Sequence, residues 1–162
     1  MAEFIIRATQ EDDRPFMREF IARQWFGEAV IIHGQFFYPA ELPGFIAQQD
    51  HLVCGLITYQ IRKSECEIIT LDSLEEGAGI GSQLIDKVKN IAIQSGCNRL
   101  TVITTNDNLE AIGFYQKCGF ILLSIFPGAL EKARELKPTI PITGKNGIPI
   151  RDEILLEMRL AE

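Results

Sequence analysis

This sequence lacks several features that would place it in a particular class of protein. Its four cysteines, Cys54, Cys66, Cys97 and Cys118, form no C-x-x-C pair, so we expect neither a disulfide framework nor a metal cofactor. Free thiols are typical of a reducing cytoplasm. No apolar run approaches membrane-spanning length, and the N-terminus has no basic region followed by an apolar stretch. We therefore expect a cytoplasmic protein with no membrane partner.

Positive charge is also scarce. The chain has 16 Lys and Arg against 22 Asp and Glu, which gives a formal net charge of -6. Sequence-independent binding of nucleic acid requires a basic surface, so a nucleic-acid partner is not expected. The length of 162 residues fits one domain.

The first half of the chain has a pattern of strands. We expect a first strand at residues 4–7 and a helix from about residue 11 to 25, with Thr9 as its cap. Three strands should follow, and their short polar connections favour antiparallel neighbours. These strands are residues 45–48, 52–61 and 66–71. Residues 29–32 suggest an edge strand, and residues 34–44 suggest a loop.

The second half alternates helices and strands. Apolar residues recur at helical spacing from Ile80 to Ala92. The later elements should be a strand at 100–105, a helix from Asn108, a strand at 120–126, a helix at 129–136 and a last strand at 154–160. We predict one α/β domain over residues 1–162, with a core at 4–126 and a C-terminal helix, Pro/Gly loop and strand at 127–162. Its mixed, mostly antiparallel, twisted sheet of about six to seven strands should be flanked by helices.

Three glycines lie between the strand that ends at Leu71 and the helix that begins near Ile80. Gly77, Gly79 and Gly81 allow a tight turn and a close approach to a ligand. Free N–H groups in the first turn of a helix then favour a phosphate. No lysine follows as a P-loop requires, and Ser82 or Leu84 stands where a dinucleotide fingerprint has glycine. A flexible turn without a ligand explains the glycines as well.

A second motif gives the glycine turn a more specific interpretation. Residues 108–120 match the pattern Asn-x-x-Ala-x-x-x-Tyr-x-x-x-Gly-Phe. Together the two segments resemble the GNAT acetyltransferase superfamily. The resemblance implies an N-acetyltransferase that moves the acetyl group of acetyl-CoA to a primary amine by direct attack in a ternary complex. At Glu76 the chain departs from the family, which usually has glutamine or arginine there.

The resemblance also implies which residues contact the coenzyme. The pantetheine should lie between two splayed parallel strands, here residues 67–71 and 100–105, and the pyrophosphate should lie at the glycine turn. The implied coenzyme-binding residues are Leu71, Ser73, Leu74, Glu76, Gly77, Ala78, Gly79, Ile80, Gly81, Ser82, Asn108 and Tyr115. Asn108 can also cap its helix.

For the residues that transfer protons, the resemblance points to one proton donor and leaves several candidates for the proton acceptor. Tyr115 is the candidate general acid, since a phenol is protonated at neutral pH. Glu67 is the first candidate for the base that deprotonates the amine, with His33 and Asp72 as alternatives. From position alone, Tyr115 would be a core aromatic residue, and Glu67 would equally be a solvated strand residue.

The acceptor is a small-molecule amine or a protein amine, and the sequence does not select between them. The acceptor site should draw on residues Trp25, Phe36, Phe37, Tyr38, Arg151, Asp152 and Glu153. Two other functions remain open: an acetyl-CoA-binding sensor without turnover, and a nucleotide-binding domain. A homodimer through residues 29–32 or the proline-rich tail is open too.

Overall fold

A computed structural model describes residues 3–160 of the chain. The strands are β1 (Ile5–Ala8), β2 (Val30–Ile32), β3 (Gln35–Phe37), β4 (Gly44–Gln49), β5 (Leu52–Arg62), β6 (Glu65–Ser73), β7 (Arg99–Thr105), β8 (Ile121–Phe126) and β9 (Glu153–Arg159). The α-helices are α1 (Arg14–Trp25), α2 (Ile80–Gln94), α3 (Leu109–Lys117) and α4 (Ala129–Leu136). Two short 3-10 helices are η1 (Glu11–Asp13) and η2 (Pro39–Glu41).

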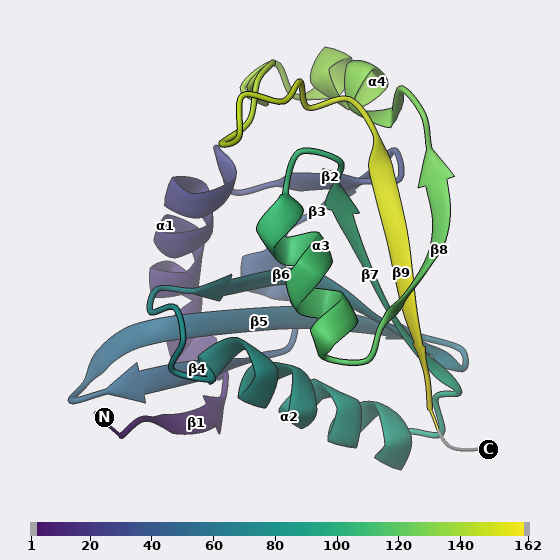
Figure 1. Ribbon diagram of the computed structural model, residues 1–162. Coiled ribbons are helices and arrows are strands. Elements are labelled where there is room, and N and C mark those ends of the chain that lie inside the picture. Colours follow the sequence, from purple (N-terminus) through teal and green to yellow (C-terminus); the bar gives the residue numbers. More distant parts are fainter. Residues whose placement is uncertain (1–2, 161–162) are drawn as a thin grey trace.

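Seven strands form one sheet in the order β1-β4-β5-β6-β7-β9-β8. All pairs are antiparallel except β6 with β7. The last strand, β9, lies between β7 and β8, so the C-terminal segment completes the sheet that the first half begins (Figure 1). The predicted fold class, a mixed and mostly antiparallel sheet flanked by helices, is confirmed.

Apolar side chains of the helices pack on both faces of the sheet. The inner side of α2, including Leu84, Ile85 and Val88, is buried with strand residues such as Leu100 and Leu156. On the opposite face, α1 packs on β4 and β5. Figure 1 shows α2 and α3 in front of the sheet and α1 behind it. Burial of about 25 cal/mol per Å² of apolar surface stabilises this layered arrangement.

The two parallel strands β6 and β7 separate partway along their length. Their pairing runs from Glu65 with Arg99 to Ile68 with Val102, although β6 continues to Ser73 and β7 to Thr105. The ladder between β5 and β6 shifts register at the same level, which leaves Ile69 without a partner in β5. Beyond Ile68, the β7-facing side of β6 therefore borders a gap, and α3 lies in front of it (Figure 1).

Two local expectations are wrong. The segment expected to be a loop contains β3, which pairs with β2 in a separate two-stranded sheet, so residues 29–32 do not form an edge strand of the main sheet. Val30, Ile31 and Ile32 are buried within this chain. Thr9 does not cap the first helix, because the N-cap of η1 is Gln10 and the N-cap of α1 is Asp13. The Asp13 side chain, at the end of η1, accepts a hydrogen bond from the backbone N–H of Gln10.

Within residues 3–160, no helix combines the length and the apolar character needed to cross a membrane.

Candidate functional site

The glycine turn joins the end of β6 to the start of α2. Gly77 and Gly79 have φ of 78° and 80°, a left-handed backbone that side chains other than glycine adopt at a cost. Gly79 is the N-cap of α2, and the cap has no side-chain hydrogen bond. A Cβ at Gly81 would lie 2.9 Å from the Phe114 ring, so the absent side chain allows α2 and α3 to approach. The first turn of α2 therefore offers free N–H groups at an open surface.

A groove connects this turn to the gap between β6 and β7. It consists of two adjoining cavities of about 550 Å³ and 530 Å³. Both cavities are lined by Leu71, Ser73, Ala111 and Tyr115. The first also contacts the glycine turn, and the second contacts both strands of the gap. The groove thus places the predicted pyrophosphate site and Tyr115 along one path.

Tyr115 lies where the two cavities meet. It is 7% exposed and packs between the rings of Phe114 and Phe120. Burial, with smaller contributions from Asp72 and Cys118, raises the pKa of the Tyr115 phenol above its usual range. The phenol therefore stays protonated at neutral pH and can donate a proton.

Asp72 lines the second cavity together with Tyr115. The Trp25 indole N–H donates to its Oδ2 at 2.8 Å, which fixes the carboxyl group against the end of α1. Burial raises the Asp72 pKa to about 6, although the Trp25 hydrogen bond and the charge of Lys145 oppose the rise. A carboxylate with this pKa is mostly ionised at pH 7 and accepts a proton readily.

Only some of the other predicted coenzyme-binding residues line the groove. Asn108 lines the second cavity, and its side chain accepts a bond from the Ala111 N–H at 3.2 Å, which confirms the helix cap. Leu74 lines neither cavity, and its own N–H donates to the Cys54 carbonyl. Ala78 packs against the core and borders a different surface hollow. Glu76 is exposed at the groove, with Glu75 and Glu110 beside it.

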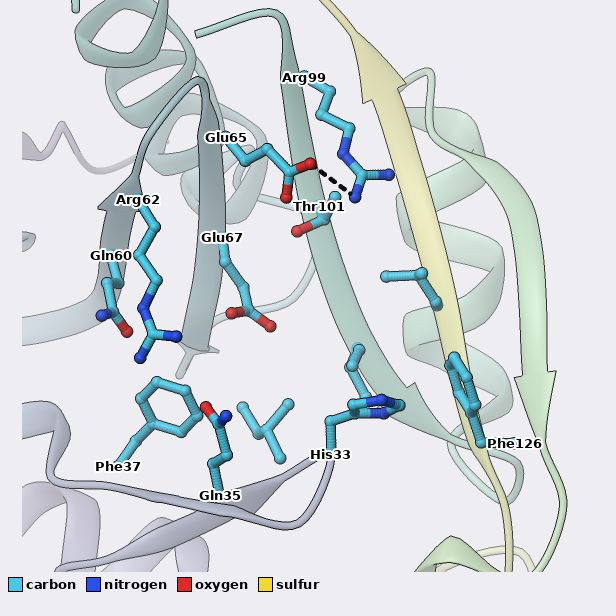
Figure 2. Close-up of a pocket in the computed structure, with 13 residues that line it drawn as sticks. His33, Gln35, Phe37, Gln60, Arg62, Glu65, Glu67, Arg99, Thr101 and Phe126 are labelled. Carbon is cyan, nitrogen blue, oxygen red and sulfur yellow. Dashed lines mark ion pairs between the residues drawn. The ribbon is translucent and has the colours of Figure 1, made fainter.

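Glu67 faces a different cavity from Tyr115. This cavity of about 260 Å³ lies between β6, β7 and the β2–β3 turn. Figure 2 shows the Glu67 carboxylate pointing into the space between the Arg62 guanidinium and the His33 ring. Burial raises the pKa of Glu67, and the neighbouring Arg62 and His33 oppose the rise. Of the three proposed bases, only Asp72 shares a cavity with the tyrosine.

Most residues expected to bind the acceptor make contacts within the chain. Asp152 accepts a bond from the Gly128 N–H and pairs with Arg151. The Glu153 carboxylate accepts a hydrogen bond from the backbone N–H of His33 at 2.9 Å. Phe37 is buried and Phe36 is exposed. Trp25 is the member of this set that lines the cavity containing Asp72.

Sequence reasoning missed the far wall of this cavity. Phe26 and the Pro/Gly loop, through Pro141, Gly144 and Lys145, complete it. The Pro and Gly content predicted a loop but gave no sign of where the loop folds back. Among residues 3–160, no group of three or more His, Cys, Asp and Glu is arranged to hold a metal.

Comparisons with known proteins agree with this fold. The model of the acetyltransferase (GNAT) family matches residues 6–120. The YdhI protein of Bacillus subtilis (strain 168) is 45% identical over 152 residues, which is 93% of this chain and 95% of YdhI. An IAA acetyltransferase from Bacillus cereus ATCC 14579 superposes with a TM-score of 0.75 at 25% identity, over 98% of this chain and 100% of that chain.

A GNAT family acetyltransferase from Elizabethkingia anophelis, solved with acetyl-CoA bound, shares the fold. Its TM-score is 0.69 at 20% identity, and the match covers 97% of this chain and 98% of that chain.

Proposed function

This chain belongs to the acetyltransferase (GNAT) family, and we propose that it transfers the acetyl group of acetyl-CoA to a primary amine in a ternary complex. The observation that carries the proposal is the continuous groove from the glycine turn to Tyr115. We place the reaction in the cytoplasm, where its four free cysteines stay reduced.

The groove fits a long coenzyme with a charged end and a reactive end. The diphosphate would bind the N–H groups at residues 77–82, where the dipole of α2 also favours negative charge. The pantetheine would extend beside Leu71 and Ser73 into the gap, where β6 has no partner on its β7 side beyond Ile68. This position would bring the thioester to Tyr115. Binding supplies most of the rate by holding two reactants together.

The amine must lose a proton before it attacks. A lysine-like amine is neutral in only about one molecule in 2,500 at pH 7, so a base accelerates the reaction. We assign this role to Asp72, because it shares the cavity with Tyr115 and one of its oxygens is fixed by Trp25. Glu67, the base that the sequence favoured, lines a different cavity from Tyr115.

During the transfer the ammonium group of the acceptor loses two protons. The ammonium gives one proton to Asp72, and the nitrogen forms a bond to the thioester carbonyl carbon. As the C–S bond breaks, Tyr115 donates its proton to the leaving sulfur and accepts the second proton that the nitrogen loses. The products are the acetylated amine, CoA thiol and one proton, which Asp72 releases to water.

A thiol-release assay with acetyl-CoA and a panel of primary amines and amino acids tests the proposal. Tyr115→Phe should lower kcat about 100-fold, the scale of general acid catalysis, and should leave the Kd for acetyl-CoA within about twofold because the ring still packs in place. Unchanged turnover in this variant would remove the acid role.

The same assay addresses the alternative of a sensor domain. The acidic side chain at Glu76, where the family usually has a neutral or basic one, is the observation that favours it. A sensor would bind acetyl-CoA by calorimetry and release no CoA thiol with any amine in the panel.

A further inference from the structure

The cavity that holds Asp72 also carries a positive charge on its opposite wall. Lys145, from the loop between α4 and β9, lines this cavity and lies near enough to Asp72 for its charge to act on the carboxyl group. Within residues 3–160, Lys145 forms no salt bridge. One carboxylate and one ammonium group therefore face the same space without pairing with each other.

The loop that carries Lys145 is anchored to the rim of the cavity. The Gly144 N–H donates to the Ile148 carbonyl at 2.9 Å, which closes the turn. The Asn146 side chain donates to the Asp107 carbonyl at 3.0 Å. A Cβ at Gly144 would collide with the Asp107 carboxyl, so the loop lies directly on this residue. Lys145 thus projects from a fixed turn.

The end of α1, which also lines this cavity, is anchored too. The Lys137 ammonium donates to the carbonyls of Trp25 and Ala29, each at 2.6 Å. The Thr139 hydroxyl donates to the Phe26 carbonyl at 2.9 Å. Phe26 ends α1 in a left-handed conformation with φ of 63°, and its ring is 54% exposed. The end of α1 is therefore held as an aromatic wall of the cavity.

We propose that the acceptor is a zwitterion, an apolar α-amino acid whose ammonium group binds Asp72 and whose carboxylate binds Lys145, with its side chain against Trp25 and Phe26. An α-amino acid carries the two charged groups on one carbon atom, and one cavity of this size presents their complements. Asp107 and Tyr115 also face the cavity. Asp107 is 6% exposed and accepts the Thr105 hydroxyl, so it is already bonded within the protein. This proposal rests on the proposed function, because it names the substrate of the same site.

Matched pairs of substrates test it. L-phenylalanine and 2-phenylethylamine differ only in the carboxylate, as do L-leucine and 3-methylbutylamine. We expect kcat/KM for each amino acid to exceed that of its amine by about tenfold or more, the scale of one charge-assisted hydrogen bond. Lys145→Gln should abolish this preference, so that each amino acid and its matched amine react with about equal kcat/KM. Lys87→Gln, at an exposed position on α2, makes the same charge change away from the cavity and should preserve the preference.

The outcomes separate the two proposals. Acetylation of the amines and the amino acids at equal rates would overturn the zwitterion and leave the acetyltransferase standing. An effect of Lys145→Gln on the Kd for acetyl-CoA, in place of the amino-acid preference, would assign Lys145 to the coenzyme and also overturn it. Acetyl-CoA binding without thiol release from any compound would contradict the acetyltransferase itself.

Discussion

Asp72 and Tyr115 reach one cavity from different elements, β6 and α3. Their environments shift both pKa values upward: Asp72 to about 6, and Tyr115 above its usual range. At neutral pH, one group is ionised and accepts a proton while the other is protonated and donates one. Two groups in opposite protonation states are what acyl transfer to an ammonium requires.

The pH dependence of turnover follows from the Asp72 pKa. A base works only when ionised, so kcat/KM should fall as the pH drops through about 6. Asp72→Asn should lower kcat/KM at pH 7.5 by about 100-fold, the scale of general base catalysis, and should remove the inflection near pH 6. Initial rates of CoA thiol release between pH 5 and 9 measure both effects, with the substrate's own ionisation determined separately.

Glu67→Gln is the matched variant, because it makes the same carboxyl-to-amide change in a cavity that Tyr115 does not line. We expect it to keep the inflection near pH 6 and most of the activity. The opposite pattern, with the inflection lost in Glu67→Gln and kept in Asp72→Asn, would make Glu67 the base.

Single residues were predictable from the sequence to different extents. Asn108 and Tyr115 belong to a local motif, so their spacing places them on one helix. The Asp72 carboxyl depends on Trp25, 47 residues earlier in the chain, and no local pattern connects the two. For the same reason the sequence could not show that Glu67 and Tyr115 face different cavities.

At the scale of elements, the glycine turn and the start of α2 form the site expected for the diphosphate. Three carboxylates, Glu75, Glu76 and Glu110, line the groove there. Negative charge near this end of a helix competes with a bound anion, and one such charge contributes about 0.3–1 kcal/mol.

Glu76→Gln should therefore tighten acetyl-CoA binding by roughly two- to fivefold. Isothermal titration calorimetry at low ionic strength measures the change, and added salt should reduce it. Glu28→Gln, an exposed position outside this groove, is the control and should leave the Kd unchanged. A weaker complex in Glu76→Gln would mean that the carboxylate holds the turn in its binding form.

The existence and type of most elements could be predicted, because α2 has a clear helical period and β5 and β6 are long apolar runs. Two features could not. β3 is three residues long and lies between glycine and proline, so its sequence resembles a loop. The insertion of β9 between β7 and β8 depends on pairing over long sequence distances, which the order of the elements does not determine.

At the scale of the whole molecule, the site lies where the first and second halves of the chain meet. β6 and α2 come from the middle of the sequence, the aromatic wall from the end of α1, and Lys145 from the C-terminal loop. The proposal of one domain over residues 1–162 fits this arrangement, since the segment 127–162 supplies β9, which lies between β7 and β8, and part of the cavity lining.

The most direct test of the account is a crystal structure of this protein with acetyl-CoA. The account predicts diphosphate oxygens within hydrogen-bond distance of the N–H groups at residues 77–82, the pantetheine between β6 and β7, and the thioester sulfur beside the Tyr115 hydroxyl. A complex in which the coenzyme lies outside the gap, or in which its sulfur is remote from Tyr115, would contradict it.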